Sequence, residues 1–254
     1  MKSPKILLFD IETSPNLAWV WGKYEQNVIE YDREWFVLCW SAKWLGSSKL
    51  LSSKLNDFKL YKKDKYNDYE VVKSLWKLFD EADIVIAHNG DKFDIKKTNA
   101  RFLFHNLLPP QPFKSIDTLK IAKKYFKFNS NKLDDLGKHL NLGRKMKHQG
   151  FDTWLGCITG DKKHWNQMIR YNKQDVRLLE EVYNKFLPYI QGHPNLGLYA
   201  RESYACPNCG STKLQCRGFS HTKTNVFQRT HCQDCGAWSQ FRKCEKKFKS
   251  DIKN

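Results

Sequence analysis

The sequence predicts a mixed α/β domain followed by a small cysteine-rich module. Strand-like apolar runs come first along the chain and strand–helix alternation follows, an order that favours a mixed sheet with helices packed on it. Six of the eight cysteines lie between Cys206 and Cys244. The chain has 254 residues, 41% of them hydrophobic and 14% aromatic, so we expect a globular domain of roughly 200 residues plus a small module.

The first part of the chain predicts three strands and one helix. Lys5–Glu12 has the apolar run of a buried strand. Trp35–Leu45 and Leu50–Leu55 are predicted to be further strands of the same sheet, joined by a turn at Gly46-Ser47-Ser48. In Tyr69–Ala82 the apolar residues recur at helical spacing. They are Val72, Leu75, Trp76 and Phe79.

The second part alternates strands and helices. We expect strands at Asp83–His88 and Lys114–Ile116, with a helix starting near Phe93 between them. The remaining expected helices are Thr118–Tyr125, Leu133–Leu140 and Gln167–Leu187. Gly192–Gly197 breaks the last helix and is interpreted as a linker. The predicted domains are therefore residues 1–195 and 201–254, with a boundary near residue 200.

Charge and cysteine usage indicate the partner and the compartment. The net charge of +17 favours an acidic partner, and the commonest one at this scale is the phosphate backbone of a nucleic acid. The apolar run Ile6–Phe9 ends at Asp10, far short of a signal core or a membrane span. We therefore expect a cytoplasmic protein without membrane contact. In such a reducing compartment, a cysteine cluster is more often a metal site than a disulfide framework.

Two carboxylates stand at the end of the first strand. Asp10 and Glu12 are two residues apart, so both side chains project from the same face. Buried side by side they repel one another and cannot both stay ionised without a cation. The alternative is a strand that simply runs out into solvent.

Two further acids occupy helices. In the run from His88 to Asp94 a strand ends, glycine permits a turn and Asp94 opens a helix, where it either serves a site or caps the helix. Tyr171 and Asp175 share one helix face that also carries packing residues. An acid on such a face is costly unless something pairs with it, and a Tyr–Asp hydrogen bond at a domain edge is the alternative.

The order of these motifs is more specific than any of them alone. Asp-x-Glu on a strand, then Asn-x-x-x-Phe-Asp, then Tyr-x-x-x-Asp resembles the DEDD superfamily of 3′→5′ exonucleases, in its tyrosine subclass. The histidine subclass has a histidine where this chain has Arg170. Over roughly residues 4–190 the chain resembles the exonuclease domain of family B DNA polymerases and related stand-alone phage and bacterial proteins. The resemblance implies a ribonuclease H-like mixed sheet with flanking helices.

The resemblance also implies roles for six residues. Four would hold two Mg²⁺ or Mn²⁺ ions: Asp10, Glu12, Asp94 and Asp175. Tyr171 would orient the attacking water, and Asn89 would contact the terminal nucleotide of the substrate. Hard divalent ions take oxygen ligands, and two of them can activate water and neutralise charge during phosphodiester hydrolysis. Asp117 either supports this site or caps a helix. The basic segment that contains Lys145 and Lys147, before Phe151–Trp154, is interpreted as a solvated loop.

Two Cys-x-x-Cys pairs predict a zinc ribbon. The four thiolates are those of Cys206, Cys209, Cys232 and Cys235. Two such turns give a tetrahedral site for one Zn²⁺, and the glycine after each pair suits a tight turn. The pattern resembles the zinc ribbons of phage nucleases and some transposases. A purely structural zinc is the alternative, since about 30 residues cannot build a sufficient core without a metal.

The C-terminal residues are more basic than the rest of the chain. Residues 201–254 carry eleven Lys or Arg and four Asp or Glu, a net charge of +7. Aromatic residues lie among these charges, a mixture that suits nucleic acid: Phe219, Phe227, Trp238 and Phe241. The ribbon is therefore expected to grip DNA, with the docking of a protein such as a separate DNA polymerase as the alternative.

The function predicted from the sequence is a two-metal 3′→5′ exonuclease. We expect it to hydrolyse DNA, single-stranded by preference, to nucleoside monophosphates in replication proofreading, recombination or DNA degradation in a bacterial or phage-infected cell. DNA is favoured over RNA, but a 3′→5′ exoribonuclease stays open. A non-catalytic nucleic-acid-binding protein is a second alternative, although all five motif residues are intact. An endonuclease or recombinase is disfavoured by the tyrosine of Tyr-x-x-x-Asp.

Overall fold

The computed structural model describes residues 4–24, 27–144 and 150–242, which form two compact units. One unit comprises residues 5–123 and 128–182. The other is built mainly from the described residues that follow Val182, together with residues 124–127. No helix among the described residues is long and apolar enough to cross a membrane.

The larger unit is built on a five-stranded mixed sheet with the strand order β5-β4-β1-β6-β7. Its strands are β1 (Ile6–Thr13), β4 (Val37–Trp44), β5 (Leu50–Lys54), β6 (Ile84–Ala87) and β7 (Lys114–Asp117). Strand β4 pairs antiparallel with β1 and β5, whereas β6 runs parallel to β1 and β7. The predicted mixed α/β class is confirmed, and β1 lies at the centre of the sheet.

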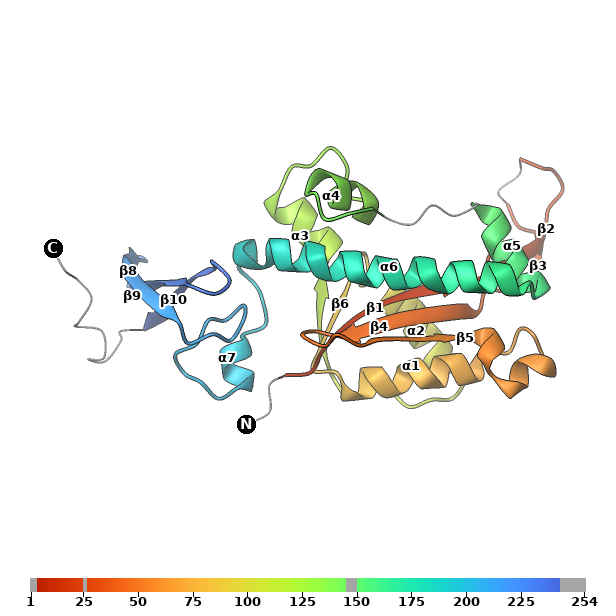
Figure 1. Cartoon of the computed structure of the whole chain (residues 1–254), viewed down its shortest axis with the longest axis horizontal. Coiled ribbons are helices and arrows are strands. Elements are labelled where there is room, and N and C mark those ends of the chain that lie inside the picture. Colours follow the sequence, from red (N-terminus) through yellow and green to blue (C-terminus); the bar gives the residue numbers. More distant parts are fainter. Residues whose placement is uncertain (1–3, 25–26, 145–149, 243–254) are drawn as a thin grey trace. The chain divides into compact units, whose positions relative to one another are not determined.

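Helices cover both faces of this sheet (Figure 1). They are α1 (Tyr69–Glu81), α2 (Asp94–Phe104), α3 (Thr118–Tyr125), α4 (Leu133–His139), α5 (Phe151–Thr159) and α6 (Lys162–Phe186), with short 3-10 turns η1 (Leu55–Asp57) and η2 (Lys59–Lys62). Alternation along β1 decides which side chains face which layer. Phe9 packs edge-on against Phe79 of α1, with ring centroids 4.8 Å apart. Asp10 points the other way and contacts α6 through Asn172.

A buried ion network joins β4, α1 and α2. The carboxylate of Asp68, at the start of α1, accepts hydrogen bonds from Val37 N (2.8 Å), Arg101 Nε (2.8 Å) and His105 Nε2 (2.6 Å). Burial alone would raise the pKa of Asp68, but the hydrogen bonds from His105 and Arg101 outweigh it and hold the pKa below its usual value. The network therefore fixes the α1–α2 layer to the start of β4.

The local structure of this unit differs from the prediction at a hairpin and at the start of α6. A two-stranded hairpin, β2 (Leu17–Trp19) with β3 (Glu30–Arg33), was not predicted, because its apolar residues face solvent instead of a core. The expected solvated loop at Lys145 and Lys147 lies outside the described residues, and Phe151–Trp154 after it belongs to helix α5. Helix α6 begins five residues before the expected Gln167, because its first turns are polar.

The smaller unit contains an antiparallel sheet in the order β10-β9-β8. Its elements are η3 (Leu187–Tyr189), α7 (Leu196–Tyr199), β8 (Leu214–His221), β9 (Val226–Cys232) and β10 (Trp238–Arg242). The expected linker at residues 192–197 includes three buried residues, His193, Leu196 and Gly197, and leads into α7. His193 Nδ1 donates to Pro194 O (2.7 Å) and Nε2 accepts from the Tyr183 hydroxyl (2.8 Å), and burial lowers the pKa of this histidine.

Asn208, in the first Cys-x-x-Cys turn, attaches that turn to the chain after α6. Its Nδ2 donates to Leu187 O (2.7 Å) and Ile190 O (2.9 Å). These carbonyls follow the last helical turn, where intrahelical partners run out. The structural unit therefore begins before residue 200, and the division into residues 1–195 and 201–254 stays a proposal about which parts act separately.

Candidate active site and cysteine cluster

Three carboxylates converge where the end of β1 meets α6. Asp10 and Glu12 project from β1, and Asp175 comes from the buried side of α6 with 2% of its surface exposed. One ligand oxygen of each lies within 4.8 Å of those of the other two. Charges this close repel strongly in a partly buried site, so the cluster has the composition and spacing of a divalent-cation site.

Asp94 is fixed to the same strand from another direction. It is the first residue of α2, is 3% exposed, and accepts a hydrogen bond from Ile11 N at 3.3 Å. Ile11 lies between Asp10 and Glu12 in the chain. Asp94 is not one of the three clustered acids, but its contact with β1 brings the fourth predicted carboxylate to the same strand end.

Helix α6 carries Tyr171, which was predicted to be a site residue, and next to it Asn172, which was not predicted. Tyr171 is largely buried, and its ring centroid lies 6.5 Å from that of Trp154 on α5. The next residue, Asn172, is fully buried, and its Nδ2 donates to Asp10 Oδ2 (2.6 Å) and Asp10 O (3.3 Å). The signal for Asn172 was its position three residues before Asp175, which places both on one helix face.

The donor set fits hydrated magnesium or manganese. All of the clustered ligands are oxygens, which Mg²⁺ and Mn²⁺ prefer, and no thiol or imidazole belongs to the cluster of three. Beside it, Asn172 Oδ1 is buried without a hydrogen-bond partner among the described residues. A buried amide oxygen of this kind suits a neighbouring metal-bound water.

Two buried thiols lie close enough to Glu12 to interact with its charge. Cys39 on β4 is the register partner of Glu12, and burial, together with the Glu12 charge, raises the pKa of Cys39 well above its usual value. Burial also raises the pKa of Cys157 on α5 to about 12. Both thiols are therefore neutral near pH 7. They make the surroundings of Glu12 poorly polar, and ion–carboxylate attraction is stronger in such surroundings.

The turn at Asn89 is held by Asp117. Asn89 has a φ of +68°, and its backbone N–H donates to Asp117 Oδ1 at 2.9 Å. The same oxygen accepts from Leu119 N (2.9 Å), so Asp117 both caps α3 and supports the turn. A pocket of about 560 Å³ opens beside this turn, and its lining includes Asp10, His88 and Asn89. The structure thus brings Asn89 to a cavity that also exposes one of the clustered acids.

A lysine that sequence reasoning missed lies next to the carboxylates. Lys97 Nζ donates to Thr13 Oγ1 at the end of β1 (3.1 Å) and stands 3.9 Å from the ring centroid of Trp35. Burial lowers the pKa of Lys97, and the charge of Asp94 opposes that effect. Its spacing from Asp94 on α2, three residues, was the available signal.

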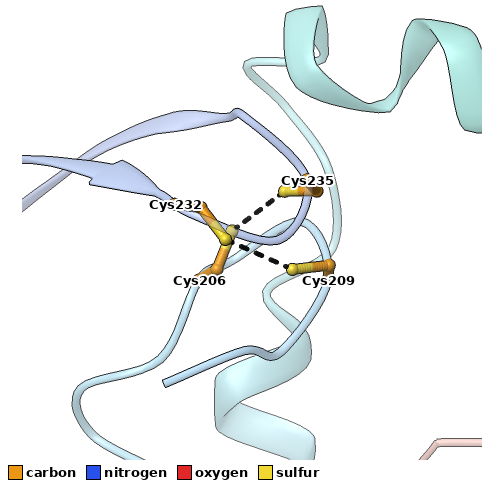
Figure 2. Close-up of side chains that lie close together, drawn as sticks. All are labelled: Cys206, Cys209, Cys232 and Cys235. Carbon is orange, nitrogen blue, oxygen red and sulfur yellow. Dashed lines mark hydrogen bonds between the residues drawn. The ribbon is translucent and has the colours of Figure 1, made fainter. Parts of the chain in front are cut away.

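The four predicted thiols form a second cluster in the smaller unit (Figure 2). Their sulfurs all lie within 4.8 Å of one another. The pairs Cys206–Cys235 and Cys209–Cys232 are each 3.6 Å apart, near the ~3.8 Å expected for sulfurs at 2.3 Å from one tetrahedral Zn²⁺. Hydrogen bonds from Cys209 and Cys235 lower the pKa of Cys206. The cluster therefore fits a four-thiolate zinc site.

Comparison with known proteins agrees with this fold. The chain is similar in structure to a family B DNA polymerase from the hyperthermophilic archaeon Pyrobaculum calidifontis, with a TM-score of 0.53 and 14% sequence identity. The match covers 87% of this chain but only 31% of the polymerase chain, so it concerns the fold alone. A search of curated proteins found no match.

The sequence also matches the model of one protein superfamily. Residues 44–187, more than half of the chain, match the RNase H superfamily. The matched region contains Asp94, Tyr171 and Asp175, while Asp10 and Glu12 precede it and join them through the sheet. The ribonuclease H-like fold predicted from the sequence is thereby confirmed, and a nuclease is supported. The chain belongs to the RNase H superfamily.

Proposed function

We propose that this chain is a two-metal 3′→5′ exonuclease that hydrolyses single-stranded DNA to nucleoside monophosphates. The observation that carries the proposal is the convergence of Asp10, Glu12 and Asp175 at the strand end to which Asp94 is also bound. The order of the motifs supports the tyrosine subclass of DEDD exonucleases, and the 3′ polarity rests on that resemblance.

In the proposed mechanism the four carboxylates hold the cations and the protein positions everything else. Bound divalent ions would neutralise phosphate charge and lower the pKa of water. The Tyr171 hydroxyl orients the attacking water, while Asn172 holds the Asp10 carboxylate in one orientation through its hydrogen bond. Such support of a ligand typically affects metal affinity 10–100-fold, roughly.

The substrate end is assigned to the pocket beside Asn89. This pocket exposes Asp10, so a nucleotide in it would present its phosphodiester to the clustered acids. Lys97 adds a positive charge at the end of β1, where it balances the carboxylates and attracts the phosphate. DNA is proposed over RNA because of the structural similarity to a DNA polymerase.

The proposed function is tested by digestion of end-labelled oligonucleotides. Single-stranded DNA, duplex DNA and RNA carrying a 5′ label are incubated with Mg²⁺ or Mn²⁺, with a 3′-labelled set in parallel. We expect a ladder that shortens stepwise from the 3′ end of single-stranded DNA, and mononucleotides from the 3′ label. Internal cuts would indicate an endonuclease, and faster digestion of RNA would favour the exoribonuclease. Binding without any hydrolysis would leave the non-catalytic alternative.

A further inference from the structure

The hairpin of β2 and β3 exposes a group of large apolar side chains. We call residues 17–24 and 27–33 the aromatic hairpin; its exposed large side chains are Leu17, Trp19, Val20, Trp21, Tyr24, Val28, Ile29 and Tyr31. Trp21 is 85% exposed and Tyr24 is 87% exposed. Exposed apolar side chains gathered on one element in this way mark a binding surface more often than chance exposure.

These side chains do not contribute to the hydrophobic core. The hairpin forms a separate two-stranded sheet that projects from the five-stranded sheet (Figure 1). Leu17 and Trp19 are two residues apart on β2 and share one face, which lies in water. A two-stranded hairpin alone is marginally stable, and side chains as exposed as Trp19 and Trp21 bury too little surface for folding to explain them.

The root of the hairpin is fixed beside the clustered carboxylates. Ser14, two residues after Glu12, donates through its backbone N to Phe36 O (2.9 Å) and accepts from Phe36 N at its Oγ (3.0 Å). Trp35 N donates to Asn16 Oδ1 (2.8 Å), and Lys97 stands over the Trp35 ring. Trp19 follows Glu12 by seven residues, a span of at most about 25 Å of extended chain.

The charge of the hairpin indicates whether it would bind the phosphates or the bases of a nucleic acid. Its described residues carry two basic side chains, Lys23 and Arg33, and two acidic ones, Glu30 and Asp32. A chain with a net charge of +17 thus presents, beside its acidic site, an aromatic surface whose described residues carry no net charge. Phosphate groups gain little electrostatic attraction from such a surface, whereas the flat faces of bases stack on Trp and Tyr. Bases expose these faces only when they are unpaired.

We propose that the aromatic hairpin stacks the unpaired bases of the substrate strand on the 5′ side of the bond that is cut. This inference rests on the proposed function for the direction of the strand. It gives a physical reason for a single-strand preference, because a duplex keeps its bases stacked on one another. Binding to the hairpin depends on the bases and not on the phosphates.

Binding to normal and abasic oligonucleotides tests this inference. The full-length protein carries Asp10→Asn to prevent cleavage, and its affinity is measured for a single strand of about ten nucleotides and for the same strand with abasic sites replacing internal bases. Trp21→Ala is expected to weaken binding of the normal strand about 5- to 100-fold, the range for one stacked base. On the abasic strand the same substitution should have little effect.

Further variants separate stacking from simple apolar contact. Trp21→Phe should keep most of the affinity, and Trp21→Leu should not, because leucine lacks a flat ring. Leu108→Ala removes another exposed apolar side chain, far from the hairpin in sequence, and serves as the control. Melting temperatures check that each variant is folded. If Trp19→Ala and Trp21→Ala combined leave strand affinity unchanged, or weaken both strands equally, the inference is wrong and a protein partner becomes the better occupant.

The outcome is distinguishable from failure of the proposed function. If the Asp10→Asn protein binds in a base-dependent way but the wild-type protein does not digest strands from the 3′ end, the exonuclease proposal is refuted. The proposed stacking role of the hairpin would then still stand. Digestion from the 3′ end with no dependence on upstream bases would refute only the hairpin's role.

Discussion

The side-chain amide of Asn172 donates hydrogen bonds to both the carboxylate and the main-chain carbonyl of Asp10. The two residues are 162 positions apart in the chain. Asn172 follows Tyr171 and precedes Asp175 by three residues, so neighbouring positions of α6 carry the amide that contacts Asp10, a carboxylate of the acidic cluster and the tyrosine proposed to orient water. The buried amide thereby fixes the orientation of a proposed metal ligand that comes from a different element.

Replacing Asn172 with Ala should weaken the site without removing a ligand. The Asp10 carboxylate would lose its bound orientation, so we expect the Mn²⁺ concentration for half-maximal cleavage to rise roughly 10–100-fold. Turnover at saturating Mn²⁺ should recover much of its original rate. The measurement is a metal titration of single-turnover cleavage.

Gln174→Ala, on the same turn of α6, is the matched control for Asn172→Ala. It should leave the metal titration unchanged. If Asn172→Ala lowered the rate at every metal concentration by the same factor, its effect would be on the fold or on the substrate and not on Asp10.

Asp175→Asn should abolish cleavage while making the metal-free protein more stable. Asp175 is almost fully buried within 4.8 Å of two other carboxylates, so neutralising it relieves repulsion. For a chain of this size each kcal/mol of relief raises the Tm by about 2–4 °C. Thermal melts with and without Mn²⁺ check this: the wild-type protein should gain stability from the metal, and the variant should gain less. Cleavage at the wild-type rate would remove Asp175 from the proposed mechanism.

Tyr171→Phe should slow the chemical step and leave metal binding alone. The ring still packs near Trp154, and only the hydroxyl proposed to orient water is lost. A reduction of roughly 10²-fold in the single-turnover rate is expected for a group of this kind. The Mn²⁺ dependence should match that of the wild-type protein. An unchanged rate would mean that Tyr171 has only a packing role.

The sequence predicted what local patterns encode. The strand that carries Asp10 and Glu12 and the helix face that carries Tyr171 and Asp175 follow from periods of two and 3.6 residues, and the central strands and most helices were correct within a few positions. The cysteine cluster was predicted from the spacing of the two Cys-x-x-Cys pairs alone.

Contacts between distant residues were beyond those patterns. Lys97 reaches Thr13 across 84 positions, and nothing in either segment marks the partner. The aromatic hairpin was missed for another reason: Leu17 and Trp19 have strand-like spacing, but hydrophobic patterning assumes that such residues are buried, and here they face water.

Asp68→Asn should destabilise the protein most strongly above about pH 4. The pKa of Asp68 is lowered in the folded state, so its contribution is fully present above the unfolded value of about 3.9 and is lost as the pH falls through the lower folded value. Removing one partner from a buried ion network costs about 3–5 kcal/mol. Denaturant unfolding at pH 7 and near pH 3 should show a large difference between wild type and variant at pH 7 and a smaller one in acid. A constant difference would mean that the hydrogen-bond geometry, not the charge, matters.

The cysteine cluster and the proposed grip on DNA can be tested without removing the smaller unit. Deleting residues 201–254 would also remove Asn208 and free the carbonyls of Leu187 and Ile190, so truncation would confuse loss of binding with damage to the end of α6. Point changes are cleaner. Cys232→Ser should lower the zinc content from one ion per chain, since loss of one thiolate compromises a four-thiolate site.

Charge removal then tests the grip with the zinc site intact. Lys223 and Arg242 are exposed basic residues of the ribbon sheet region, and changing both to Ala should keep the zinc. If each contacts a phosphate, strand affinity falls and the slope of log affinity against log salt flattens by about 0.7 per contact. Lys77→Ala, which removes one exposed positive charge from α1, should change neither quantity. If the ribbon instead docks a protein, the ribbon variants will match the Lys77 control, because strand binding would then involve none of the ribbon's charges.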